Sequence, residues 1–286
     1  MENALDVKSN ARGLYMALRS LALYALLLFV GFYFDNIYLW IVLWILGSFL
    51  FSTFFSLLHW SIHGSLFRSS ILNDVFGRIF ATLSIDVCCY YKYWHYIHHD
   101  QTNEEGDAEG FHITSLSSYV KALLRYFLNH YTRFVDYYQT LFANTENRQK
   151  YYEAHRTEFF FDTALLIMWV YLLIGLTYFF PVVMLKAYFM PILFSLPLLF
   201  FLDLAEHYGT QHNPDSPYSA TRTIIGNAFT RFLTAYSNYH LEHHLNPTVS
   251  YFHMQDLREE LLPKAPYKAQ SYFAFHLALL KELARK

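Results

Sequence analysis

The sequence predicts an all-α integral membrane protein with four transmembrane helices in two hairpins and a cytoplasmic helical cap that carries clustered histidines. Three observations support this prediction. The composition is 55% hydrophobic and 15% charged, well below the charged fraction of about 25% in ordinary soluble domains. Four apolar runs approach or reach the length of about 20 residues that spans a bilayer. Almost all lysines and arginines, and all the histidine clusters, lie in segments that flank these runs.

The first two apolar runs predict a helical hairpin near the N-terminus. Residues 1–20 are polar and are expected to form a short surface helix. Residues 21–34 are apolar but short, so residues 16–18 are needed to complete a span, with Arg19 extending its charged end to the interface. After a tight turn, residues 37–58 are apolar over a length sufficient to cross the membrane.

The middle of the chain is more polar. Residues 76–91 are moderately apolar but contain Arg78 and Asp86, which indicates an interfacial or buried helix. Residues 102–110 read TNEEGDAEG, which is typical of an acidic, turn-forming loop. Residues 119–142 mix charged and apolar residues, as in an amphipathic helix that lies along a membrane surface.

Two further apolar runs complete the predicted membrane region. Residues 159–180 form the third span, and residues 182–204 form the fourth. Pro191 and Pro197 interrupt the fourth span, which is tolerated where neighbouring helices satisfy the freed carbonyls. The remaining tail is polar, contains one histidine cluster and is expected to include a C-terminal amphipathic helix. The sequence contains no repeat or flexible linker, so residues 1–286 are expected to form a single domain.

The positions of the basic residues predict the orientation in the membrane. Of the 21 lysines and arginines, all but Lys186 lie in the N-terminal tail, in residues 59–158 or from residue 205 onward. Because basic loops favour the cytoplasmic side, both termini, the middle loop and the histidine clusters are expected to lie there. The net charge of −2 gives no reason to expect a nucleic-acid partner.

Three histidine clusters are the most informative motifs of the sequence. The first has a spacing of four residues. Each of the others places three histidines at i, i+3 and i+4, so a helix directs the imidazoles of one cluster to one face. Their members are His59 and His63; His95, His98 and His99; and His240, His243 and His244. Imidazole is a good ligand for iron, copper, zinc and nickel, and eight histidines exceed the four ligands of one zinc ion. The clusters therefore favour two metal ions with open positions.

These clusters and their surroundings resemble the membrane-bound fatty acid desaturase superfamily. The order HxxxH, HxxHH and HxxHH is similar to that family, as are the flanking sequences HGSLF, TNEEGDAEG and NYHLEHHLNP. The resemblance covers about residues 55–260. It implies a di-iron, oxygen-dependent enzyme that desaturates, hydroxylates or ketolates hydrocarbon chains. It also implies a further histidine ligand at the end of the fourth span, where this chain has His207, four residues after Asp203.

Several other polar residues lie near the clusters. The resemblance implies an amide or other polar group that holds a metal-bound water at the position of Asp203, and a carboxylate departs from that pattern. Glu242, next to candidate ligands, is expected either to accept an imidazole N–H or to lie on a solvated helix face. Asp107 is expected to be a loop contact. The alternative for Asp203, and the expectation for Glu206, is that the carboxylate merely solvates a helix end, and the role of His212 stays open. Isolated histidines are expected at the surface or behind the ligands, namely His112, His130, His155, His253 and His276.

We therefore predict a desaturase that uses two irons and O₂ to introduce a double bond into a fatty acyl chain. A hydroxylase or ketolase of an alkane, a sterol or a carotenoid is the first alternative. A metal transporter is the alternative from another class, disfavoured because the predicted spans contain almost no polar residues to line a path. The resemblance implies a ferredoxin-like or cytochrome-type electron donor, since the sequence has no haem-binding or dinucleotide-binding motif. Trp60, Tyr93, Trp94 and the aromatic residues of the second and fourth spans are candidates to line a narrow acyl tunnel.

Overall fold

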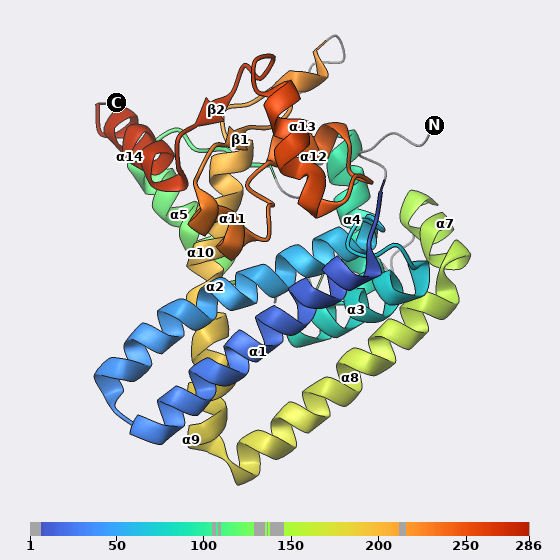
Figure 1. Ribbon diagram of the computed structural model, residues 1–286, viewed down its shortest axis with the longest axis vertical. Coiled ribbons are helices and arrows are strands. Elements are labelled where there is room, and N and C mark those ends of the chain that lie inside the picture. Colours follow the sequence, from blue (N-terminus) through green and yellow to red (C-terminus); the bar gives the residue numbers. More distant parts are fainter. Residues whose placement is uncertain are drawn as a thin grey trace.

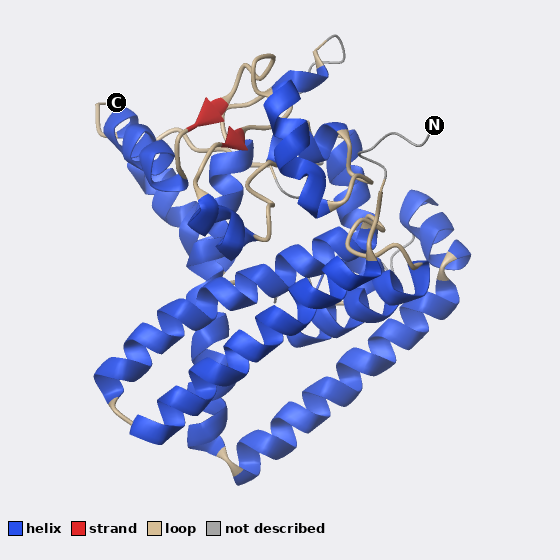
Figure 2. Ribbon diagram, in the orientation of Figure 1, coloured by secondary structure: helices blue, strands red, loops and turns tan. Residues whose placement is uncertain are grey.

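The computed structural model describes residues 7–104, 107, 110–128, 135, 137, 146–211 and 216–285. In this part of the chain, four long helices form one region, and shorter elements gather toward one end of them (Figure 1). Figure 2 shows that helices dominate and that the strands are two short segments within this second region. The four long helices are long and apolar enough to cross a membrane, by length and composition. The predicted number of spans is thus confirmed for the described residues.

The first long helix, α1 (Asn10–Phe34), is continuous where the sequence predicted a surface helix followed by a short span. Ser9 begins α1 by accepting a hydrogen bond from the backbone N–H of Arg12. The prediction of a separate surface helix over residues 1–20 is wrong for the described residues, because nothing after Ser9 interrupts the backbone hydrogen bonds. The first turns of α1 simply lengthen the span.

Helix α2 (Ile37–Ile62) is the central helix of the long-helix region. Of its most apolar 18 residues, 67% are buried, compared with 22% in α1 and 17% in α8 (Arg156–Phe179). It packs against α1, α3 (Ser70–Leu83) and the last long helix. Because the first histidine motif begins in the last turn of α2, this central position carries His59 into the interior.

The fourth span is divided by proline, and its neighbours compensate. Pro191 has no N–H for the carbonyl of Ala187, four residues earlier. The O–H of Tyr24 donates to that carbonyl instead, and Trp44 Nε1 donates to the carbonyl of Lys186 at 3.0 Å. The side chains of α1 and α2 therefore supply donors at the irregular segment, as expected for a proline-interrupted span. The span consists of α9 (Pro181–Met184), the π-helix η2 (Leu185–Phe189) and α10 (Met190–His207).

The single helix predicted over residues 76–91 is wrong, because the chain forms α3 and α4 (Cys88–Asp100) there. Between them, Ile85 adopts a left-handed backbone conformation with φ 57°, which a continuous right-handed helix does not allow. Asp86 Oδ1 accepts a hydrogen bond from the N–H of Val87 at 2.8 Å. The break lets α4 begin as a separate helix that carries the second histidine cluster.

The shorter elements gather at one end of the long helices (Figure 1), and α4 and α12 among them contain histidines of the clusters. The parallel strands β1 and β2 pair with each other, and β1 contacts both α10 and α12, so the C-terminal segment is held against the fourth span. Helix α5 forms only the first part of the predicted helix over residues 119–142, most of whose remaining residues lie outside the described part. The predicted C-terminal helix is present as α14. The elements are α5 (Leu116–Tyr126), α7 (Glu146–Ala154), η3 (Pro217–Ser219), β1 (Thr223–Ile224), α11 (Ala228–Thr234), α12 (His240–Leu245), η4 (Tyr251–His253), α13 (Met254–Leu261), β2 (Lys268–Ala269) and α14 (Tyr272–Leu283).

Candidate metal centre

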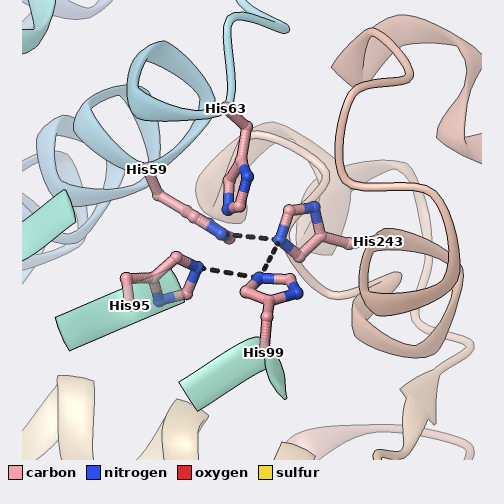
Figure 3. A group of neighbouring side chains, drawn as sticks. All are labelled: His59, His63, His95, His99 and His243. Atoms are coloured by element: carbon pink, nitrogen blue, oxygen red, sulfur yellow. Dashed lines mark hydrogen bonds between the residues drawn. The ribbon is translucent and has the colours of Figure 1, made fainter. Parts of the chain in front are cut away.

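Five histidines from three helical segments point toward one another (Figure 3). His59 lies in the last turn of α2 and His63 directly follows that helix, His95 and His99 lie in α4, and His243 lies in α12. One ring nitrogen of each lies within 4.8 Å of a ring nitrogen of every other. We name these residues the five-histidine group.

The Nε2 atoms of this group form a chain of short contacts. His59 Nε2 lies 2.8 Å from His243 Nε2, which in turn lies 3.1 Å from His99 Nε2. The same atom of His99 lies 3.0 Å from His95 Nε2. A neutral imidazole nitrogen carries either one hydrogen or one in-plane lone pair, so it cannot form two full hydrogen bonds to ring nitrogens at once. The Nε2 atoms of His243 and His99 therefore lack a satisfactory set of partners among the described residues.

A metal ion would satisfy these contacts. Two nitrogens bound to one ion at about 2.1 Å and at a right angle lie about 3.0 Å apart, which matches the observed separations. In addition, His63 Nε2 is buried and has no hydrogen-bond partner among the described residues. Buried polar atoms are normally partnered, so the donor set of the five-histidine group fits a bound metal ion.

Four more histidines form a second group beside the first. His98 comes from α4, His207 ends α10, and His240 and His244 come from α12, with one ring nitrogen of each within 4.8 Å of the others. The ring of His244 stacks on that of His99, with centroids 4.1 Å apart. Both ring nitrogens of His207 are buried without a hydrogen-bond partner among the described residues. We name these residues the four-histidine group, and its donors also fit a metal ion.

Two carboxylates lie behind the four-histidine group. Asp107 Oδ1 lies 2.8 Å from His98 Nδ1, and both side chains are fully buried. Glu206 Oε2 lies 3.3 Å from His240 Nδ1, and its other oxygen accepts a hydrogen bond from the O–H of Tyr272. A carboxylate hydrogen-bonded to the outer nitrogen of an imidazole, as Asp107 is to His98, fixes the orientation of the ring and increases the basicity of its inner nitrogen. Glu206 acts on His240 through its charge, because His240 Nδ1 makes no hydrogen bond among the described residues. Asp107 is thus more than the plain loop contact that the sequence predicted.

Asp203 also lies close to the four-histidine group. Its carboxylate, that of Glu206 and a ring nitrogen of His207 lie within 4.8 Å of one another. Asp203 Oδ2 accepts a hydrogen bond from the O–H of Tyr126 in α5. The Asp203 carboxylate is therefore part of the polar surroundings of the histidines and does not merely solvate the end of α10.

Burial keeps the imidazoles that lie outside the membrane-spanning helices in their neutral form. Desolvation lowers the pKa of His63, His243 and His244 well below the ordinary value, and neighbouring imidazoles lower it further. A neutral imidazole has a lone pair for a metal ion without first losing a proton. Desolvation also raises the pKa of the Glu242 carboxyl to about 7. The neutral imidazoles, rather than this carboxyl, thus prepare the site for a cation.

Comparison with known families agrees with this arrangement. The sequence model of the fatty acid desaturase family matches residues 36–276, a range that contains all nine histidines of the two groups. The chain belongs to the fatty acid desaturase family. No curated protein matches the chain significantly. Family membership, four apolar helices and clustered histidines together fit a metal-binding membrane protein of the desaturase family.

In this member of the desaturase family, a cavity between α2 and α10 reaches the two histidine groups. His59 and His95 of the five-histidine group and His240 of the four-histidine group line it, together with Asp203 and Glu206. Its apolar wall consists of Phe51, Phe55, Ile192, Leu196, Leu199 and Leu202. The cavity therefore brings an apolar surface directly to the histidines.

Of the aromatic residues expected to line an acyl tunnel, Phe51 and Phe55 of the second span line the cavity, whereas Trp60, Tyr93 and Trp94 do not. Trp60 is fully buried, and its Nε1 donates to the carbonyl of Ala235 at 2.9 Å, which ties α2 to the segment before α12. The aromatic residues that do line the cavity include Tyr91 of α4. Helical position, rather than residue type, decides which aromatic ring faces the cavity.

Glu242 occupies a different place from the one expected. Its Oε1 accepts a hydrogen bond from the hydroxyl of Thr223 at 3.0 Å, and the side chain is buried. Among the described residues it makes no hydrogen bond to an imidazole, and it does not lie on a solvated face. Glu242 instead connects α12 to β1, while the carboxylate contact to His240 comes from Glu206. The sequence could not show that Glu206, rather than Glu242, contacts His240, because Glu206 lies far from His240 in the sequence.

The isolated histidines lie apart from both groups. His112 is exposed, and His155 and His253 face Glu158 and Asp256 near the surface. His276 is buried instead: its Nε2 donates to the carbonyl of Phe201 at 2.7 Å, and its Nδ1 lies 2.9 Å from the hydroxyl of Tyr119. It therefore joins α14 to α10 and α5. His130 and His212 lie outside the described residues.

Proposed function

We propose that this protein is an oxygen-dependent desaturase that introduces a double bond into a fatty acyl chain with the help of two iron ions. Residues 1–286 would act as one functional domain. The main support is the convergence of nine histidines into two adjacent groups at an apolar cavity, in a member of the fatty acid desaturase family.

The five-histidine group would hold one iron and the four-histidine group the other. Bound iron would supply the oxygen activation needed to remove hydrogen from an unactivated CH₂ group, which no side-chain base can achieve. Imidazole is a suitable ligand for iron. Asp107 would keep His98 in the tautomer whose inner nitrogen is free for the metal, and the negative charge of Glu206 near His240 would favour a bound cation.

The cavity between α2 and α10 would bind the acyl chain. Side chains such as Phe51, Phe55 and Leu196 would hold the methylene groups by burying them away from water. Asp203, hydrogen-bonded to Tyr126, would orient polar groups around the four-histidine group at the inner end of the chain. Glu242 would act at a distance from the substrate by holding α12 in place through Thr223.

The proposed reaction requires a supply of electrons. Two adjacent CH₂ groups and O₂, with two electrons and two protons, give CH=CH and two water molecules. The sequence contains no haem-binding or dinucleotide-binding motif, so a separate ferredoxin-like or cytochrome-type carrier would deliver the electrons. The four long helices would cross the membrane as two hairpins, with both termini and the histidine groups on the cytoplasmic side where that carrier is found.

Isotope labelling tests this proposal. Cells that express the protein are incubated under ¹⁸O₂, and their lipids are analysed by mass spectrometry. We expect a new carbon–carbon double bond in a fatty acyl chain and no label in that product. His243→Ala is expected to abolish the product, whereas His253→Ala, which changes a histidine outside both groups, is expected to retain it.

Two results would contradict the proposal. Label in a hydroxyl or keto product, without an alkene, would assign the protein to the hydroxylases or ketolases. Uptake of radioactive metal into vesicles that contain the protein, with no oxygen-dependent lipid product, would favour the transporter.

A further inference from the structure

A second cavity reaches the five-histidine group from the side of His63. It lies between the start of α1, the end of α2, helices α3 and α4, and the start of α8. Four basic side chains line it, from Lys8, Arg68, Arg78 and Lys92. The cavity between α2 and α10, by contrast, meets the same group at His59 and His95. The five-histidine group can therefore be approached along two different routes, one apolar and one charged.

One of the four basic residues is occupied by a structural ion pair. Arg78 Nε lies 2.5 Å from Asp162 Oδ1, and the other oxygen of Asp162 accepts a hydrogen bond from the N–H of Cys89 at 2.9 Å. Asp162 is buried at the start of α8, so this pair joins α3, α4 and α8. Its charges neutralise each other and leave Arg78 with no surplus charge for a partner.

The other three basic residues retain their charge for a partner. Lys8, Arg68 and Lys92 form no ion pair with a carboxylate in the part of the chain that the structure describes. Lys8 Nζ donates only to the carbonyl of Gly64, at 2.8 Å. Two further carboxylates line the cavity: that of Glu158 faces His155 at 3.5 Å, and that of Asp74 lies on the exposed side of α3. With Asp162, three carboxylates face four basic side chains, so the net formal charge of the cavity is +1. Its basic side chains outside an ion pair are Lys8, Arg68 and Lys92, defined as the basic face.

Tyr96 connects the basic face to the five-histidine group. Its side chain is 39% exposed, and its ring centroid lies 5.4 Å from that of His63. The O–H of Tyr96 donates to the carbonyl of Ile62 at 2.7 Å, which holds the ring at this position. Lys92, one helical turn earlier, places its Nζ 5.8 Å from the centroid of the same ring. A molecule bound at the basic face would therefore touch a residue that contacts the histidine group.

We propose that Lys8, Arg68 and Lys92, arranged around Tyr96, form the docking surface for an acidic one-electron carrier protein. This inference rests on the proposed desaturase function, because desaturation consumes two electrons that the chain cannot supply itself. The substrate chain would occupy the route at His59, which leaves the route at His63 for the carrier. Charge complementarity of this kind accelerates encounter and fixes orientation, and it weakens with salt.

Binding measurements test the docking surface independently of catalysis. The full-length protein is placed in nanodiscs of phosphatidylcholine, and its affinity for an acidic plant-type ferredoxin is measured at low and high salt. We expect salt-sensitive binding by the wild type. Arg68→Glu and Lys92→Glu should each raise the Kd at low salt by about tenfold or more. The matched control Lys281→Glu, on the exposed side of α14 and outside the basic face, should change the Kd by less than about twofold.

A turnover assay separates this inference from the proposed function. Reduction by the small methyl viologen radical cation should give the same amount of desaturated lipid in Arg68→Glu, Lys92→Glu and wild-type protein, since no protein docks. If the wild type binds ferredoxin in this way but makes no alkene with either reductant, the proposed function fails and the docking surface stands.

Two results would overturn the docking surface. One is a wild type that does not bind ferredoxin, or variants that bind it as tightly as the wild type does. The other is unchanged ferredoxin binding together with weaker binding of phosphatidylglycerol vesicles by the variants, which would identify the cavity as a lipid headgroup site.

Discussion

The two histidine groups differ in what lies behind them. In the four-histidine group, the outer nitrogens of His98 and His240 face the carboxylates of Asp107 and Glu206. In the five-histidine group, imidazoles contact one another through Nε2, and His63 lies at the edge that the basic cavity reaches. One group therefore has fewer ligands but negative charge close to them, and the other has more ligands with the positive charge of Lys92 nearby.

This difference shows that the two sites need not bind metal equally well. Carboxylates behind imidazole ligands favour a cation through charge and through the orientation of the rings. A fifth imidazole provides a similar advantage by adding a ligand, without adding charge. The removal of one ligand or one carboxylate, or the protonation of one imidazole, should therefore affect the two groups to different degrees.

The largest effect is expected from His98→Ala. It leaves the four-histidine group with three ligands, and it removes the imidazole partner of the fully buried carboxylate of Asp107. Loss of a hydrogen bond to a charged group destabilises by about 1.5–3 kcal/mol. We expect at least half of the bound iron and nearly all activity to be lost. His63→Ala leaves four ligands in the other group and should lose less iron.

Metal analysis of the purified variants, with His253→Ala as the control, measures this difference. Equal iron contents in His98→Ala and His63→Ala would show that the numbers of ligands in the two groups do not matter.

A smaller effect is expected from Glu206→Gln. The amide can still accept the hydrogen bond from Tyr272, but the negative charge next to His240 is lost. Changes of this kind typically weaken metal affinity by about 10–100-fold. Competition with a chelator should release one of the two irons earlier than in the wild type, and Glu260→Gln on the exposed face of α13 should behave like the wild type. The release of both irons together, or no change, would argue against the carboxylate support.

The smallest effect per residue is expected from lowering the pH, which should protonate histidines of both groups. Desolvation lowers the pKa of His63, His243 and His244 in the folded protein, whereas unfolded histidine takes up a proton near pH 6.5. The stability of the iron-free protein is therefore full above about pH 6.5 and decreases below it. One pH unit below that value, each buried imidazole destabilises the fold by about 1 kcal/mol.

Thermal melting of the iron-free protein from pH 7.5 down to pH 5.5 checks the sign of this effect. The midpoint should fall, and iron binding should weaken over the same range. A midpoint that is constant or rises toward acid pH would contradict the burial of neutral imidazoles.

The sequence predicted much of the candidate site. Helical spacing placed the histidines of each cluster on one face, and the apolar runs placed all the clusters near the ends of spans. His207 was identified by resemblance alone, and the structure brings it next to His98 and His240, with ring centroids 4.6 Å away in each case. The clusters could be predicted because they depend on local periodicity, whereas His207 depended on the resemblance.

The division of the histidines into two groups could not be predicted. His98 and His99 are adjacent in the sequence, yet they belong to different groups. Both lie on α4, where the side chains of neighbouring residues point about 100° apart, so His98 faces one group and His99 faces the other. The pairing of Glu206 with His240 likewise depends on how α10 meets α12. Spacing along one helix contains no information about such contacts between helices.

The errors in the fold had local causes. The sequence of residues 76–91 shows continuous moderate hydrophobicity, and a non-glycine residue with a left-handed backbone, Ile85, is rare enough that a break there is not expected. In α1, the polar residues near the start concealed a helix that continues into the span. Composition identifies how much of a segment is apolar more reliably than where its helix begins.

Two short helices, α4 and α12, each contribute histidines to both groups, whereas α2 contributes only to the five-histidine group and α10 only to the four-histidine group. An ion bound in either group would therefore immobilise α4 and α12, and with them most of the ligands of the other group. The second ion would then bind to ligands that are already in place, at a smaller entropic cost. Loading should thus be cooperative, so that at substoichiometric iron the protein divides mainly into chains with both ions and chains with neither.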